Sequence, residues 1–90
     1  MNLLLHCPML NAWLQQEMTV AEIEAEHIHH GKALGYLNDR WETLKASMQA
    51  GDALWSFSSP PETWQHLCGR SGIALVRDGK IIDFLVIVMN

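Results

Sequence analysis

The sequence predicts one α+β domain over residues 1–90, with helices layered on one face of a small antiparallel sheet. Two observations carry this prediction. Apolar residues repeat at helical spacing between residues 20 and 48, and an Asp-Gly pair separates two apolar runs further on. At 49% apolar and 18% charged residues, the chain is too hydrophobic for disorder, so we expect a modest core.

The first elements are predicted to be helices. Pro8 is suited to the first turn of a short helix over residues 9–17, and Leu10, Trp13, Leu14 and Met18 recur at helical spacing there. Thr19 and Glu22 then have the spacing of a capping box, in which each side chain satisfies a free backbone amide. A second helix is therefore predicted to begin at Val20.

This second helix is predicted to be long and amphipathic, continuing to about residue 48. Gly31 and Gly35 each cost about 1 kcal/mol in a helix interior, so a break into two helices near them is one alternative. Close approach of another backbone is the other. The predicted apolar stripe has heptad spacing and consists of Val20, Ile23, His27, His30, Leu34, Leu37, Trp41, Leu44 and Met48.

A strand and a short helix are predicted next. Residues 54–58 alternate as a strand does, with Trp55 and Phe57 on one face. Ser59 is the expected helix cap and Pro60 the first helical residue. Gly69 follows closely, so the helix is predicted to be short.

The sheet is predicted to end in a hairpin. Residues 73–77 and 80–88 flank Asp78-Gly79, the pair that a two-residue type I′ turn prefers. That turn would place Leu75 opposite Ile82. Residues 86–89 would then extend past the first strand and pair elsewhere: with residues 54–58, with the apolar N-terminal residues, or with a neighbouring subunit. A sheet of three or four strands results.

Charge and cysteine content narrow the classes of function. Six basic residues, dispersed along the chain, stand against ten acidic ones, so nucleic acid is not an expected partner. Cys7 and Cys68 form neither a paired metal motif nor a disulfide framework. We expect a cytoplasmic protein without a signal peptide, and no apolar window is long enough to span a membrane.

The densest group of candidate ligands lies in the predicted long helix. Glu24, His27 and His30 are placed to share a divalent metal, since side chains three or four residues apart lie on one helix face. A second interpretation is that the two histidines form hydrogen bonds in a seam between helices. A third is a pH response, because protonated histidines in a buried seam would repel each other.

Evidence for catalysis is absent from the sequence. Cys68 and His66 lie too close along the chain to face each other, so Cys68 is interpreted as a core residue. The segment from Gly69 to Gly72 precedes a strand, whereas phosphate-binding loops precede a helix. No catalytic residue and no cofactor are predicted, and the four tryptophans are interpreted as core anchors.

The region from Gly51 to Gly79 resembles a family of proteins. The matching pattern is Gly-Asp-x-Leu-Trp-x-Phe-Ser-Ser-Pro-Pro-Glu-x-Trp, followed by Gly-Arg-x-Gly-x-Ala-Leu-Val-Arg-Asp-Gly. It is similar to small uncharacterised bacterial proteins, some of them of the mobile-cassette type. The resemblance implies a compact bacterial domain and assigns no activity and no functional residue.

These observations favour a non-catalytic interaction or regulatory module that acts as a homodimer. Such a protein would bury its patterned apolar surface against a second chain. The alternative is a small metal- or ligand-binding protein that uses Glu24, His27 and His30. A toxin-neutralising or stress-response partner from a mobile element is a third hypothesis. The residues predicted to contact a partner are Leu34, Leu37, Trp41, Val86 and Val88.

Overall fold

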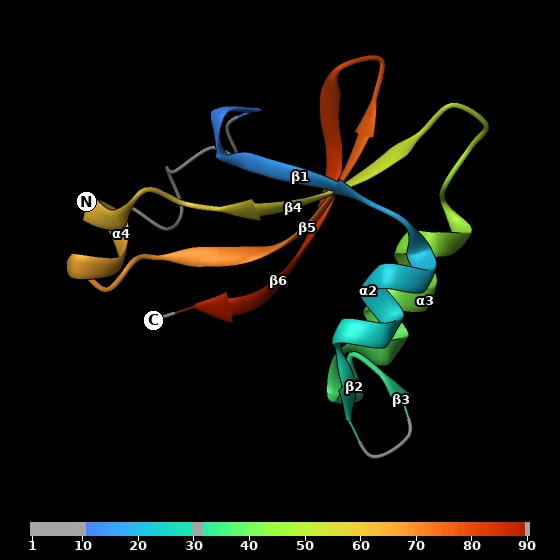
Figure 1. Cartoon of the computed structure of the whole chain (residues 1–90), viewed down its shortest axis with the longest axis horizontal. Coiled ribbons are helices and arrows are strands. Elements are labelled where there is room, and N and C mark those ends of the chain that lie inside the picture. The colour runs from blue at the N-terminus through green and yellow to red at the C-terminus, as the bar shows by residue number, and fades with distance from the viewer. Residues whose placement is uncertain (1–10, 30–31, 90) are drawn as a thin grey trace.

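A computed structural model describes residues 11–29 and 32–89. Its main sheet is antiparallel throughout and has the strand order β1-β4-β5-β6. Two helices lie on one side of this sheet, and a third connects its middle strands at the far end (Figure 1). The predicted α+β class and four-stranded sheet are confirmed. The strands are β1 (Leu14–Met18), β4 (Ala53–Ser58), β5 (Arg70–Arg77) and β6 (Lys80–Met89).

The predicted helix over residues 9–17 is wrong in the described part. Asn11–Trp13 forms one 3-10 turn, and Leu14–Met18 is the edge strand β1, paired with β4. Trp13 is buried against the face of the sheet opposite α2 and α3, together with Phe57. The residues that suggested a helix are therefore apolar because they cover the sheet. Pro8 lies outside the described residues.

The helix start at Val20 is confirmed. α2 (Val20–Glu26) begins after Thr19, whose hydroxyl accepts the Glu22 amide while the Glu22 carboxylate accepts the Thr19 amide. This reciprocal pair satisfies two amides that have no partner within the helix.

The single long helix predicted to follow is not present in the described residues. α2 ends at Glu26, with His27 as its C-terminal cap. Further on, Leu34 and Gly35 have φ angles of 62° and 53°, which exclude a right-handed helix at those two positions. The alternative of a break near Gly35 is confirmed, while Gly31 lies outside the described residues. The chain instead forms β2 (Ile28–His29), β3 (Lys32–Ala33), η2 (Gly35–Leu37) and α3 (Asn38–Ala46).

The elements between β4 and β5 follow the prediction with a shift of one residue. Pro60, not Ser59, is the capping residue of α4 (Pro61–Gln65), and Pro61 takes the first helical position. The Ser59 hydroxyl bonds instead to Thr63 Oγ1 at 2.6 Å and to the Arg70 amide at 2.9 Å. It therefore joins the start of α4 to the start of β5.

The hairpin is confirmed, but its predicted register is wrong beyond Val76. Asp78 and Gly79 have the positive φ angles, 53° and 76°, of a type I′ turn. Leu75 pairs with Asp83 instead of Ile82, because an extra residue enters β6. β5 also begins at Arg70, which pairs with Met89. Residues 86–89 therefore have a strand partner, and the predicted overhang is absent.

The core occupies both faces of the sheet. On one face α2 and α3 contribute Ile23, Trp41 and Leu44, which are fully buried against strand residues that include Leu54 and Leu75. The smaller cluster on the opposite face contains Trp13, Phe57 and Ala74, and Phe84 packs against it. Phe57 and Phe84 meet edge to face, with ring centroids 6.2 Å apart.

Candidate interaction surface

Strand β6 forms one edge of the main sheet, because β5 is its only strand neighbour among the described residues. The Phe84 amide donates to Asp83 Oδ1 at 2.8 Å, and the Phe84 carbonyl accepts a hydrogen bond of 3.1 Å from Arg40 of α3. Both backbone groups of Phe84 therefore point away from β5. Since this direction alternates along an antiparallel strand, those of Val86 point outward too.

The exposed large apolar side chains of the described residues are concentrated on this strand. Ile82, Val88 and Met89 belong to β6 and are 45%, 51% and 60% exposed. Leu67, which is 72% exposed, lies beside the end of β6, since it precedes Arg70 by three residues and Arg70 pairs with Met89. We call these four residues the β6 surface. They lie towards the two ends of this edge strand and do not form one continuous patch.

Leu67 has an unfavourable backbone conformation. The Leu67 amide bonds to the Trp64 carbonyl and the Cys68 amide to the Thr63 carbonyl. This is the Schellman arrangement at the end of a helix, and it places Leu67 in the left-handed region, with φ of 60°. Glycine usually holds this position, because a side chain there costs about 1–2 kcal/mol.

The sequence predicts that this helix ends close to Gly69. Gly69 serves another purpose, since a Cβ atom there would overlap the Trp64 ring. The Trp64 indole donates to the Ser59 carbonyl at 3.1 Å, which fixes the ring in place. Position 69 therefore requires a glycine for close packing against Trp64, and the left-handed position is held by Leu67.

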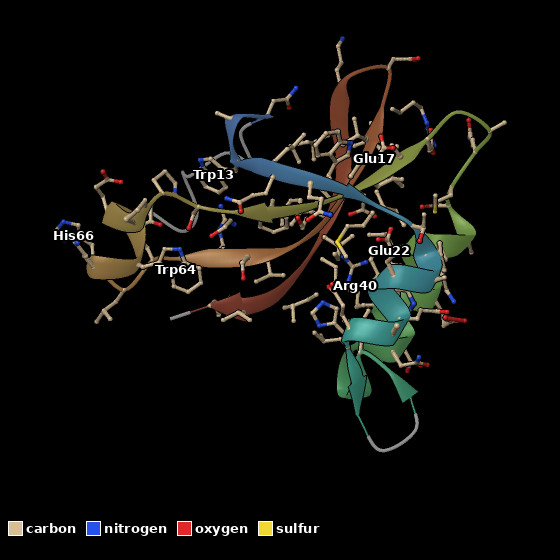
Figure 2. The ribbon with its side chains drawn as sticks, viewed as in Figure 1. Trp13, Glu17, Glu22, Arg40, Trp64 and His66 are labelled. Atoms are coloured by element: carbon tan, nitrogen blue, oxygen red, sulfur yellow. The ribbon has the colours of Figure 1, made fainter. Side chains whose placement is uncertain are left out.

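A hollow of about 510 Å³ lies near the opposite end of β6, between that strand and the loop after α3. Ile82 and Asp83 line it from β6, Leu75 from β5, and Met48 and Gln49 from the loop. Its wall is partly apolar and ends on an exposed apolar residue, Ile82. Figure 2 shows His66, the neighbour of Leu67, on α4 at the end of the sheet far from α2 and α3, and Arg40 beside those two helices.

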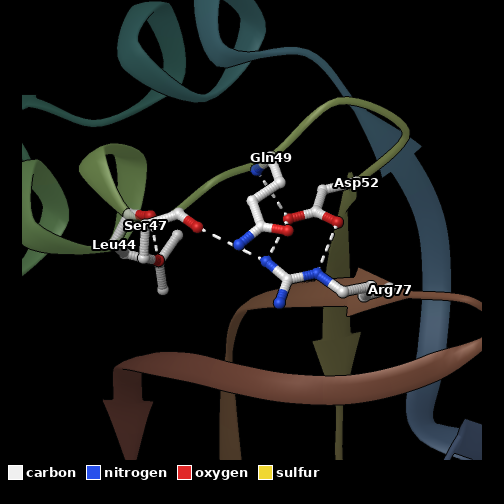
Figure 3. Close-up of polar contacts among 5 residues, drawn as sticks. All are labelled: Leu44, Ser47, Gln49, Asp52 and Arg77. Atoms are coloured by element: carbon white, nitrogen blue, oxygen red, sulfur yellow. Dashed lines mark hydrogen bonds and ion pairs between the residues drawn. The ribbon is translucent and has the colours of Figure 1, made fainter.

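An ion pair holds the loop that forms this wall. Arg77 donates from Nε to Asp52 Oδ1 at 2.9 Å and from Nη2 to Oδ2 at 2.8 Å, while Oδ2 also accepts the Gln49 amide (Figure 3). The Asp52 side chain is 1% exposed. Its hydrogen bonds with Arg77 and with the Gln49 backbone lower the pKa of Asp52 to about 2.

The residues predicted to contact a partner fall into two groups. Leu34 and Trp41 are buried in the core of this chain, and Leu37 packs against the same cluster, so these three are not available to a partner in this conformation. Val86 is half-buried and Val88 is exposed at the sheet edge.

Sequence reasoning missed Leu67, Ile82 and Met89. The run from Phe84 to Met89, which has no polar residue, was a signal for Met89. Leu67 and the bulge at Ile82 had no local signal.

Glu24, the first predicted metal ligand, is engaged within the chain. Its Oε2 atom accepts hydrogen bonds from Lys45 Nζ at 2.6 Å and from the Trp41 indole at 2.9 Å. The bond from Lys45, followed by that from Trp41, lowers the pKa of Glu24. Lys45 also lies 5.4 Å from the Trp41 ring centroid. This cluster joins α2 to α3.

The other predicted ligands are not brought to Glu24 in the described part. His27 follows α2 as its C-terminal cap and lines a separate hollow of about 180 Å³ with Glu26, Ser56 and Ser71. His30 lies outside the described residues. Within residues 11–29 and 32–89 no three His, Cys, Asp or Glu side chains are grouped to hold a metal ion. The metal site remains a prediction.

The cysteine and histidine near α4 have structural positions. Cys68 is buried, as predicted for a core residue. His66 follows α4 as its C-terminal cap and is exposed. Cys7 and His6 lie outside the described residues.

Comparison with known proteins finds no matching family model, no significantly similar curated protein and no significantly similar solved structure. Among the helices of the described residues, none combines the length and the apolar character needed to cross a membrane.

Proposed function

We propose that this protein is a non-catalytic interaction module that forms a homodimer through the edge of β6. The observation that carries the proposal is the position of the β6 surface. Every large apolar side chain exposed in the described residues lies on that strand or beside its end. Burial of such area is favourable by about 25 cal/mol per Å², and two-fold dimers are the commonest soluble oligomers.

The composition of β6 supports an added strand. Residues 84–89 are all apolar, and they pack into both clusters of the core, with Leu85 on one face and Phe84 on the other. Edge strands that stay unpaired usually carry charges or prolines. The backbone of β6 at Phe84 is contacted by two charged side chains, that of Asp83 from the same strand and that of Arg40 from α3. No comparable cover is found at Val86 among the described residues.

A two-fold axis beside Val86 gives the simplest dimer. Antiparallel pairing of the two β6 strands then sets Val86 opposite itself. A register shift between the partners of Gly72 and Ser71 leaves Ile87 as an extra residue in β6, so the regular ladder lies on the Phe84 side of Val86. Each copy contributes the same apolar edge, as an isologous interface requires. The two main sheets would join into one sheet of eight strands.

The test is sedimentation equilibrium of the untagged protein and its Val86→Pro variant. Proline removes the outward amide without a cost to the ladder with β5, so the variant is expected to be a folded monomer. Val86→Thr keeps the amide and should remain a dimer. Val88→Lys places a charge at an exposed position of the edge without changing the backbone, and this variant should also be a folded monomer. A concentration of about 100 μM lies far above the dissociation constants of stable dimers, so a wild-type protein that is monomeric there would contradict the proposal.

Native mass spectrometry of untagged protein separates this proposal from the metal-binding alternative. A dimer without metal supports the interaction module. A monomer with one divalent ion, lost in Glu24→Gln, would support the site predicted at Glu24, His27 and His30. The engagement of Glu24 by Lys45 and Trp41 favours the first outcome.

A further inference from the structure

We propose that the hollow between β6 and the loop after α3 binds a small zwitterion of the α-amino acid class, with its carboxylate on Arg77 and its ammonium group on Asp83. The hollow has a volume of about 510 Å³, and small-molecule sites typically have volumes of roughly 300–1,000 Å³. The residues that line it belong to a single chain. The site therefore goes beyond the proposed dimer and does not depend on it.

Arg77 and Asp83 line the hollow from the same face of the sheet. Asp83 pairs with Leu75, and Arg77 follows Leu75 by two residues along β5, so all three side chains lie on the face that α2 and α3 cover. Ile82, the extra residue of the β6 bulge, lies beside Asp83. An acidic and a basic side chain thus contribute to one hollow from neighbouring strands.

Arg77 has hydrogen-bond donors that the chain does not use. Its Nε and Nη2 atoms donate to the Asp52 carboxylate at 2.9 and 2.8 Å, and Nη2 also donates to the Ser47 carbonyl at 3.4 Å. These bonds fix the guanidinium group and leave Nη1 without a bond to any described residue. Figure 3 shows this third nitrogen on the side away from Asp52. Guanidinium N–H groups are strong donors to a carboxylate.

Asp83 likewise has an acceptor that the chain does not use. Its Oδ1 atom accepts the Phe84 amide at 2.8 Å and lies 3.9 Å from Arg40 Nη2. Within the part of the chain that the structure describes, Oδ2 has no hydrogen-bond partner. The side chain is 41% exposed, so a ligand can reach it. An ammonium group is the complementary donor, because its bond to a carboxylate is charge-assisted.

The balance of charge favours a zwitterion over a simple anion or cation. Asp52 offsets the charge of Arg77, and Arg40 lies close enough to Asp83 to offset part of its charge. A ligand with a net charge therefore gains little Coulomb energy, whereas a zwitterion uses the donor and the acceptor together. The hollow also has an apolar wall, which selects an aliphatic side chain on the ligand. The residues of that wall include Leu75, Met48 and Ile82.

The test is calorimetric titration of the untagged full chain with ligands of similar shape. These are leucine, 3-methylbutylamine, which lacks the carboxylate, and 4-methylpentanoate, which lacks the ammonium group. Leucine is expected to bind with a dissociation constant of about 1 mM or below, and each analogue about tenfold or more weakly, because a charge-assisted bond is lost. Absence of leucine binding at about 10 mM, or equal binding of either analogue, would overturn the proposal.

Asp83→Asn tests the position of the ammonium group. The substitution keeps the Oδ1 acceptor for the Phe84 amide and removes the charge, so leucine should bind about tenfold more weakly while 4-methylpentanoate is unaffected. Asp39→Asn, at an exposed position of α3 outside the hollow, is the matched control and should bind leucine as the wild type does. An unchanged leucine affinity in Asp83→Asn would overturn the site. Sedimentation equilibrium reports the dimer separately, so either proposal can fail without the other.

Discussion

Arg77 and Asp52 face each other in a two-pronged ion pair that joins the last residue of β5 to the loop after α3. The loop wall of the hollow beside Ile82 depends on this pair, because Asp52 also binds the Gln49 amide. Paired donors fix geometry as well as charge. The pair therefore holds the loop after α3 in place beside β5 and β6.

Asp52→Asn is expected to destabilise the protein in a pH-dependent manner. The pKa of Asp52 in the folded protein, about 2, lies below its ordinary 3.8. The folded state therefore binds fewer protons, and this stabilisation is present above pH 3.8 and is lost as the pH falls through 2. Thermal melts of both proteins at pH 7 and near pH 2 check this. The difference in melting temperature should shrink at the lower pH; a constant difference would contradict the assignment to the carboxylate.

Trp41→Ala is expected to cost about 3–5 kcal/mol in the free energy of unfolding, because a fully buried large ring is removed from the main core. The change also takes away the indole donor of Glu24. Urea denaturation measures the loss. Gln15→Ala, at an exposed position on β1, is the control and should stay within about 0.5 kcal/mol of the wild type. A similarly small loss in Trp41→Ala would contradict the burial of Trp41 in the main core.

Gly72→Ala should destabilise the hairpin, although alanine normally suits a strand better than glycine. A Cβ atom at position 72 would overlap the Leu85 carbonyl of the neighbouring strand, so β5 and β6 would have to separate. Gly79→Ala meets no neighbouring atom and has only the cost of positive φ, about 1 kcal/mol. Urea denaturation should therefore rank Gly72→Ala as the more damaging change, and the reverse order would contradict the close strand contact.

Arg40→Ala should strengthen dimer formation. The guanidinium covers the Phe84 carbonyl, which lies on the edge that pairs with the second copy in the proposed dimer. One released backbone acceptor is worth about 0.5–1.5 kcal/mol, or about two- to tenfold in the dissociation constant. The exposed ion pair with Asp83 should contribute at most about 1 kcal/mol to stability. Arg40→Lys keeps the charge and serves as control. Weaker association in Arg40→Ala would argue against pairing at Phe84.

Local sequence signals predicted local structure well. The capping box at Thr19 and the turn at Asp78-Gly79 depend on neighbouring residues alone, and both are confirmed. The heptad stripe failed as evidence for one helix because two helices that bury the same face give the same spacing. The first helix ends at Glu26 and the second begins at Asn38, with the left-handed residues Leu34 and Gly35 between them.

The candidate surface was less accessible to sequence reasoning. Val88 was named because residues 86–89 were expected to extend past the first hairpin strand and pair elsewhere. That reason is wrong, since this part of β6 pairs with β5. The bulge near Ile82 depends on packing across the hairpin and has no residue signature. Leu67 was hidden because Gly69 supplied a plausible helix end, and only the packing of Trp64 shows why that glycine serves another contact.

The side-chain bond from Asp83 to the Phe84 amide has a consequence for amide hydrogen exchange. In an isolated chain the edge of β6 should exchange unevenly: slowly at Phe84, whose amide has an acceptor, and quickly at Val86, whose amide faces solvent. Dimer formation should slow exchange at Val86 and leave Phe84 little changed. The exchange rate of the Val86 amide relative to that of Phe84 therefore reports dimer formation, and NMR can measure both without any substitution.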